Sequence, residues 1–148
     1  MTEDHLAVSR RARFFSLGPA PDAAVLWIAL HGYGQLAARF LRELEPVADG
    51  RTLVVAPEAL SRFYLETARD GRHGERIGAS WLTREDREAE IADTVGYLDA
   101  LLRHLLAGRA SRPAIGVLGF SQGGAAAVRW VARGEVRPAR LVLWGAGL

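Results

Sequence analysis

The chain has 148 residues, of which 49% are hydrophobic and 24% are charged, as is typical of one globular domain with a buried core. All 19 basic residues are arginine and no cysteine is present, which excludes disulfides, thiolate metal sites, cysteine nucleophiles and lysine-dependent catalysis. The net charge is only +2 because 17 acids are interleaved with the arginines, and this argues against a nucleic-acid-binding surface. We therefore expect residues 1–148 to form a single domain with no metal centre and no nucleic-acid partner.

The sequence shows no sign of a membrane-spanning segment or of a secretory signal. The longest uninterrupted apolar run, residues 23–30, has 8 residues, far fewer than the roughly 20 that a membrane-spanning helix needs. Residues 1–5 show no basic region followed by an apolar stretch, so we expect no secretory signal, no integral membrane segment and a cytoplasmic location.

In the first half of the chain, strands are predicted to alternate with one helix. Continuous apolar runs indicate buried strands, and apolar residues at intervals of three and four indicate a helix. The predicted elements are a strand at 13–17, a turn at 18–22, a strand at 24–30, a helix at 36–48 lined by Leu36, Phe40, Leu44 and Val47 and stopped by Gly50, and a strand at 52–56.

The second half continues the alternation after a long connection. Residues 58–82 have no clean period and are predicted to form a surface loop or a partly helical excursion. We then predict a long helix capped by Thr83, lined by Ile91, Val95, Leu98, Leu102 and Leu105 and ended by Gly108, a strand at 115–118, a helix from Gly123 to about Arg133, and a strand at 141–144. The fold class is therefore α/β, with a mostly parallel sheet that is covered by helices on both faces.

The segment Gly119-Phe120-Ser121-Gln122-Gly123 lies where the predicted strand 115–118 meets the following helix. A serine at such a turn is forced into a strained backbone conformation, and glycines two positions before and after it let the strand and the helix approach each other. The pattern predicts a nucleophile elbow, with Ser121 as the nucleophile and the backbone N–H of Gln122 as an oxyanion donor. The alternative interpretation is a coincidental glycine-rich turn.

A second motif, His31-Gly32-Tyr33-Gly34, directly follows the predicted strand at 24–30. Hydrolases with a nucleophile elbow place their other oxyanion donor after this strand, and the glycines would let the backbone N–H of Tyr33 point at the substrate oxygen. The alternative is an ordinary strand-ending turn that contains two glycines.

The two segments 30–34 and 119–124, which include Gly124, resemble the paired signatures of the phospholipase/carboxylesterase family of the α/β-hydrolases, to which the acyl-protein thioesterases belong. The similarity covers roughly residues 24–148. It implies the α/β-hydrolase fold and a serine carboxylesterase, thioesterase or lysophospholipase that needs no cofactor and acts on a small ester or thioester substrate. Gln35 departs from the family pattern, in which an aspartate commonly follows the second glycine.

The order of the catalytic residues in α/β-hydrolases is serine, acid, histidine. After Ser121 the chain has one acid, Glu135, and no histidine. The four histidines of the chain, His5, His31, His73 and His104, all precede Ser121. None of them is expected to be the general base, because each would require a fold outside the usual order of the triad, and His31 already belongs to the second motif. We therefore predict the N-terminal two thirds of the fold, lacking the last strand and helix units with the triad acid and histidine, and almost no activity for this chain alone.

Two expectations concern partners and rival functions. If the strand at 141–144 pairs on one side only, its apolar edge favours self-association. The alternative to a hydrolase is a non-catalytic module that binds an acyl ligand or a partner chain. A nucleotide-binding domain ranks last, since the chain lacks lysine and a glycine-rich loop of the right spacing.

Overall fold

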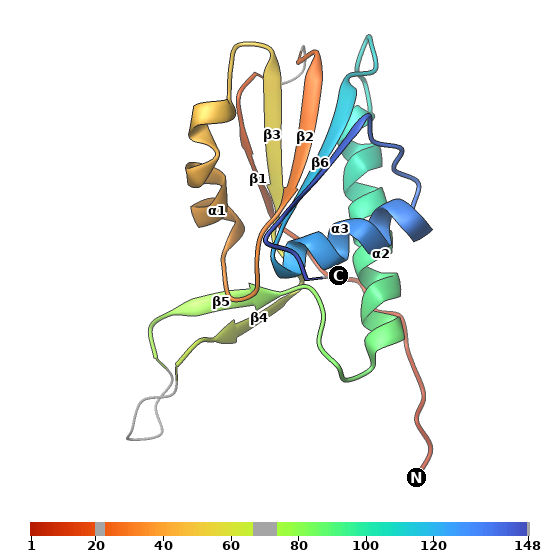
Figure 1. Cartoon of the computed structure of the whole chain (residues 1–148). Helices are drawn as coiled ribbons and strands as arrows, with labels where there is room; N and C mark the ends of the chain where they lie inside the picture. Colours follow the sequence, from red (N-terminus) through yellow and green to blue (C-terminus); the bar gives the residue numbers. More distant parts are fainter. Residues whose placement is uncertain (20–22, 67–73, 148) are drawn as a thin grey trace.

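A computed structural model describes residues 1–19, 23–66 and 74–147. Its centre is a sheet of 5 strands in the order β1-β3-β2-β6-β7 (Figure 1). β1 is antiparallel to β3, and every other neighbouring pair is parallel, which confirms the predicted mostly parallel α/β sheet. The strands are β1 (Phe14–Leu17), β2 (Val25–Leu30), β3 (Thr52–Pro57), β6 (Ala114–Phe120) and β7 (Arg140–Trp144).

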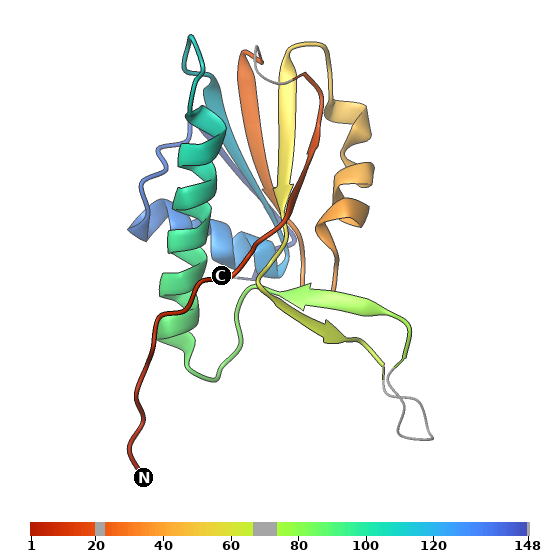
Figure 2. The ribbon, with the colours of Figure 1, turned by 180° about the vertical axis from the view of Figure 1, so that it is seen from behind.

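Helices lie on both sides of this sheet, as Figures 1 and 2 show from opposite directions. Leu26 and Ile28 of β2 belong to the core on the side of α2 and α3, whereas Ala29 belongs to the core on the side of α1. Because both faces of β2 are packed, its sequence is continuously apolar rather than alternating. The helices are α1 (Ala37–Glu43), α2 (Arg87–Leu106) and α3 (Gln122–Arg133). Among the described residues, no helix combines the length and the apolar character that crossing a membrane requires.

Two predicted helix boundaries are wrong. The helix predicted at 36–48 ends at Glu43, and a short 3₁₀ turn, Glu45–Val47, follows it. Pro46 explains this end, because its ring would clash with the carbonyl of the residue four positions earlier. The long helix α2 starts at Arg87 and not after Thr83, since the Thr83 hydroxyl donates a hydrogen bond to the Glu90 carboxylate at 2.9 Å instead of capping the helix.

The prediction of a loop over residues 58–82 is also wrong. Two short antiparallel strands, β4 (Ser61–Tyr64) and β5 (Ile77–Ser80), occupy it and lie beyond the ends of β2 and β3 (Figure 1). β5 is fastened to the loop after β2, because the Gly34 N–H donates to the Ala79 carbonyl at 2.9 Å and the Ala79 N–H donates to the Gln35 carbonyl at 3.1 Å. His73 and part of the turn predicted at 18–22 lie outside the described residues.

Strand β7 is less covered than the rest of the sheet. All five residues of β7 are exposed. On the side of α1, an apolar hollow of about 300 Å³ lies between the end of α1 and β7, and we call it the apolar hollow. Its lining residues are Trp27, Ala29, Leu44, Val47, Val54, Leu118, Val142 and Trp144.

Candidate active site around Ser121

Ser121 occupies the single-residue turn between β6 and α3. Its backbone has φ 51° and ψ −119°, a region that residues with a side chain rarely adopt and that costs about 1–3 kcal/mol. The turn is held by a hydrogen bond from the Ser121 N–H to the Trp144 carbonyl at 2.8 Å. The Ser121 hydroxyl does not cap α3, so it stands half-buried at the N-terminal end of this helix without a capping role.

The glycines around Ser121 are required by close approaches of the backbone. A Cβ atom on Gly119 would lie 2.5 Å from the Cα of Gly124, and one on Gly123 would lie 2.2 Å from the Leu30 carbonyl oxygen. A Cβ atom on Gly124 would lie 2.3 Å from that of Ala146. The glycines therefore let the start of α3 contact both β6 and the end of β2.

The loop after β2 lies beside this turn. A Cβ atom on Gly32 would meet the Phe120 ring at 3.0 Å. The Gly32 N–H donates a hydrogen bond to the side-chain oxygen of Gln35 at 2.7 Å. Gln35 therefore accepts a hydrogen bond that the carboxylate of an aspartate at this position could also accept. Among the described residues, the backbone N–H groups of Tyr33 and Gln122 have no hydrogen-bond partner. The Tyr33 side chain is 61% exposed, with its ring centroid 5.2 Å from that of Phe63.

The side chain of Gln122 joins the turn to the segment after β5. Its oxygen accepts the Trp81 N–H at 2.9 Å, and its nitrogen donates to the Leu82 carbonyl at 2.7 Å and to the Ser80 hydroxyl at 3.0 Å. The Trp81 indole N–H in turn donates to the His31 carbonyl at 2.8 Å. Sequence reasoning identified only the backbone of Gln122, because its side-chain partners are about 40 positions away.

His31 is fully buried, and both of its ring nitrogens are engaged. Nδ1–H donates to the Gly32 carbonyl at 2.8 Å, and Nε2 accepts the Ala59 N–H at 3.1 Å. Burial lowers the pKa of His31 below its ordinary value of 6.5, against smaller opposing contributions from the Gly32 carbonyl and the Glu58 carboxylate. His31 is therefore a neutral structural residue and is not available as a general base.

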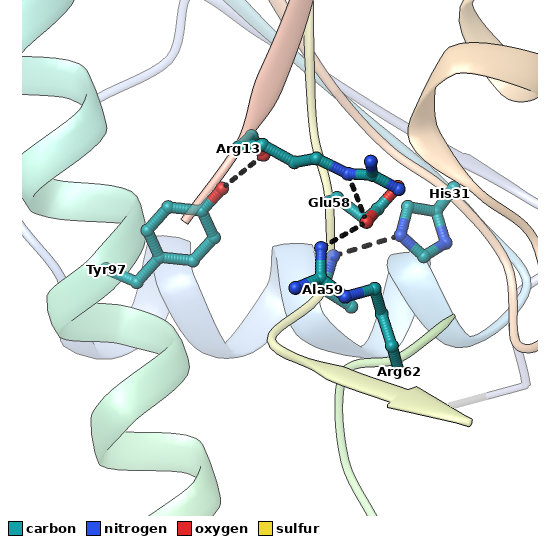
Figure 3. A network of polar contacts seen from close by, with 6 residues as sticks. All are labelled: Arg13, His31, Glu58, Ala59, Arg62 and Tyr97. Atoms are coloured by element: carbon teal, nitrogen blue, oxygen red, sulfur yellow. Dashed lines mark hydrogen bonds and ion pairs between the residues drawn. The ribbon is translucent and has the colours of Figure 1, made fainter. Parts of the chain in front are cut away.

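Glu58 lies close to His31 and was not predicted from the sequence (Figure 3). Its side chain is 1% exposed. Both carboxylate oxygens accept hydrogen bonds from Arg13, at 2.7 and 3.0 Å, and Arg62 donates to one of them at 3.2 Å. The Tyr97 hydroxyl donates to the Arg13 carbonyl at 3.2 Å, and burial raises the pKa of Tyr97. The cluster fastens β1 to the chain that follows β3.

The remaining acid and histidines lie in other places. Glu135 forms an ion pair with Arg103 at 2.6 Å, beyond the far end of α3, which at 12 residues is about 18 Å long. His104 is exposed on α2, with its ring 5.8 Å from that of Phe14. On the surface, Nε2 of His5 lies 2.8 Å from a carboxylate oxygen of Asp86. The structure thus places the two predicted motifs side by side, whereas Glu135, His104 and His5 lie elsewhere.

Backbone strain at Ser121 leads to a prediction about stability. We expect Ser121→Gly to have a free energy of unfolding about 1 kcal/mol higher than Ser121→Ala, because both variants lose the hydroxyl and only glycine relieves the positive φ. At Ser61, in the extended strand β4, the same pair of variants should show the opposite order. Urea denaturation measures both pairs, and equal stability of the two Ser121 variants would contradict the strain.

The buried neutral His31 leads to a prediction about pH. Below about pH 6.5 the unfolded chain binds a proton at His31 that the folded chain does not, so the free energy of unfolding should fall by up to about 1.4 kcal/mol per pH unit on this account. Above pH 6.5 the contribution is fully present. Urea denaturation between pH 7.5 and 5.5 should show a shallower slope for His31→Gln than for the wild-type chain. Equal slopes for the variant and the wild type would refute the assignment.

Comparisons with known proteins bear on the fold. No family model and no curated protein matches the sequence. Among solved structures, a phospholipase/carboxylesterase from Dyadobacter fermentans is 19% identical with a TM-score of 0.65, over 96% of this chain and 63% of that chain. Zea mays acyl-protein thioesterase 2 is 20% identical with a TM-score of 0.63, over 93% and 63%. Esterase PE8 is 27% identical with a TM-score of 0.57, over 84% and 59%.

These neighbours are all α/β-hydrolases, and the chain spans less than two thirds of the length of each. The partial coverage agrees with the sheet that ends at the uncovered strand β7. The resemblance seen in the two motifs is thus confirmed for the fold: over the part that it spans, the chain has the α/β-hydrolase fold.

Proposed function

We propose that the chain is a serine hydrolase domain of the carboxylesterase, thioesterase or lysophospholipase type. The observation that carries the proposal is the turn at Ser121, where a non-glycine residue keeps a φ of 51° among glycines whose replacement would create clashes. Strain of this kind is retained mainly at functional sites. The esterases, thioesterase and phospholipase among the structural neighbours support a hydrolase of the α/β type.

In the proposed reaction, the Ser121 oxygen adds to the carbonyl carbon of an ester or thioester while its proton passes to a base. The N–H groups of Tyr33 and Gln122, which have no partner within residues 1–19, 23–66 and 74–147, would then donate hydrogen bonds to the oxyanion. Expulsion of the protonated alcohol or thiol leaves an acyl-enzyme, which water hydrolyses to the carboxylic acid. The positive end of α3 favours the developing negative charge.

The chain offers no histidine after Ser121, and the neutral His31 has both ring nitrogens in use. We therefore expect slow ester hydrolysis by residues 1–148 alone. Without a working triad, an oxyanion hole and substrate binding retain about 10³–10⁴-fold acceleration over water at most. Hydrolysis of p-nitrophenyl butyrate at the rate of an ordinary esterase, abolished in Ser121→Ala, would contradict this expectation.

A boronic acid tests the nucleophile without requiring turnover. When a serine oxygen adds to n-butylboronic acid and the hydroxyl proton passes to the buffer, the boron becomes tetrahedral and negatively charged and resembles the intermediate of acyl transfer. We expect ¹¹B NMR to show a one-to-one tetrahedral adduct with the chain, no adduct with Ser121→Ala, and an unchanged adduct with the exposed control Ser61→Ala. An undiminished adduct in Ser121→Ala would refute Ser121 as the nucleophile.

A second candidate function rests on the apolar hollow. A volume of about 300 Å³ lined by apolar side chains suits an acyl chain, as in the alternative of a non-catalytic module that binds an acyl ligand. One-to-one binding of a fatty acid that survives Ser121→Ala and is lost in Val47→Arg, which places a charge in the hollow, would favour this candidate over the hydrolase.

A further inference from the structure

The side-chain amide of Gln122 uses both of its polar atoms on one short segment, residues 79–82, which we call the bridging segment. The amide oxygen accepts the Trp81 N–H at 2.9 Å, and the amide nitrogen donates to the Leu82 carbonyl at 2.7 Å. The nitrogen also donates to the Ser80 hydroxyl at 3.0 Å. A backbone N–H can only donate and a carbonyl can only accept, so this position requires a side chain that carries an acceptor and a donor on one group, as an amide does.

The bridging segment is itself firmly held. Ser80 and Trp81 are each 3% exposed. The Trp81 carbonyl accepts a hydrogen bond from the Thr94 hydroxyl of α2 at 3.2 Å, and the Ser80 hydroxyl donates to the Leu82 carbonyl at 3.0 Å. The amide of Gln122 is therefore fastened to a buried, hydrogen-bonded part of the fold and not to a free surface loop.

The same segment holds the loop after β2 on both sides of Tyr33. On one side, the Trp81 indole N–H donates to the His31 carbonyl at 2.8 Å. On the other side, the Gly34 N–H donates to the Ala79 carbonyl at 2.9 Å. The bridging segment thus connects the loop that carries one proposed oxyanion donor to the residue that carries the other.

We propose that the side-chain amide of Gln122 is a positioning group, which sets the distance between the two oxyanion donors through the bridging segment. This inference rests on the proposed function, in which the donors are the N–H groups of Tyr33 and Gln122. Gln122 is the first residue of α3, so no hydrogen bond within the helix fixes the direction of its N–H. Oxyanion donors are effective only at about 2.7–3.1 Å from the oxyanion, and a small displacement of one donor would therefore weaken the site while leaving Ser121 in place.

The affinity for n-butylboronic acid tests this role, because its tetrahedral adduct with Ser121 carries the negative charge that the two donors would contact. Gln122→Met keeps the length of the side chain and adds no charge, but it removes the three hydrogen bonds to the bridging segment. We expect its dissociation constant to be about tenfold higher than that of the wild-type chain, since complete loss of one oxyanion donor costs about 10²–10³-fold. Ser80→Ala removes one of the three bonds and should give a smaller change in the same direction, which keeps the test available if Gln122→Met does not fold.

Asp99→Ala is the matched control, because it weakens the opposite end of α3. Asp99 is 8% exposed, and its carboxylate accepts the Trp130 indole N–H at 2.7 Å and the Glu135 N–H at 2.9 Å. The variant should lower the free energy of unfolding, because it leaves a buried donor without its partner, and it should bind the boronic acid as the wild type does. A merely structural role of the Gln122 side chain predicts lower stability and unchanged affinity for both variants.

NMR relaxation of the ligand-free chain tests the positioning without an adduct. We expect the ¹⁵N order parameter of the backbone N–H at 122 to be about 0.85 in the wild type and in Asp99→Ala, and to fall toward about 0.6 in Gln122→Met. An unchanged order parameter, or an adduct of equal affinity in the wild type and Gln122→Met, would overturn the positioning role alone. The absence of any adduct with the wild-type chain would instead overturn the proposed hydrolase.

Discussion

Replacing Gly123 by alanine is expected to lower the free energy of unfolding by about 3 kcal/mol or more, which places it among the largest single-residue effects in this chain. The added Cβ would lie 2.2 Å from the Leu30 carbonyl oxygen and 2.5 Å from that of His31. Both are backbone atoms, so no side-chain rotation relieves the contact. The start of α3 would have to move away from β2, and with it the Gln122 N–H would leave its place beside the loop after β2.

The matched control is Gly96→Ala. Gly96 lies on the exposed side of α2, and a Cβ there meets no atom within 4 Å. Alanine should stabilise the helix by about 0.5–1 kcal/mol, the usual advantage over glycine inside a helix. Urea denaturation of both variants should thus give changes of opposite sign. A Gly123→Ala variant as stable as the wild type would mean that α3 does not contact the end of β2 as described.

The turn at Ser121 was predictable from sequence because its requirements are local. The glycines at 119 and 123 stand at fixed distances from Ser121, and apolar runs on either side identify the strand and the helix. The partners of the Gln122 side chain could not be predicted, since they come from Leu82 and Trp81, about 40 positions away. The strands β4 and β5 could not be predicted either, because a strand of four residues is too short to show an alternating pattern.

β7 shows a different limit of sequence reasoning. Its run of four apolar residues correctly predicts a strand, and such a run is typical of strands buried on both faces. An apolar run indicates that a strand is suited to burial, however, and it does not determine how exposed that strand is. β7 is therefore correctly placed beside β6, while its residues stay exposed in the part of the chain that the structure describes.

The second large effect on the free energy of unfolding is expected at Arg13. We expect the removal of Arg13 to cost more than the removal of its partner, Glu58. The Glu58 side chain is 1% exposed, whereas the side chain of Arg13 is 50% exposed. Arg13→Met would leave a buried carboxylate with Arg62 as its remaining charged partner, and we expect a loss of about 2–3 kcal/mol. Glu58→Leu would leave two arginines that water can reach, and we expect a loss of about 1 kcal/mol or less.

The double variant Arg13→Met with Glu58→Leu completes the cycle. It should be more stable than Arg13→Met alone, because the uncompensated buried charge is gone and the apolar side chains can pack between β1 and the chain after β3. Arg11→Met, at an exposed position of the same N-terminal segment, should change the stability by no more than about 0.5 kcal/mol. Urea denaturation at pH 7.5 gives all four values. If Glu58→Leu proved more costly than Arg13→Met, the attraction between the two charges, and not the desolvation of the carboxylate, would dominate this cluster.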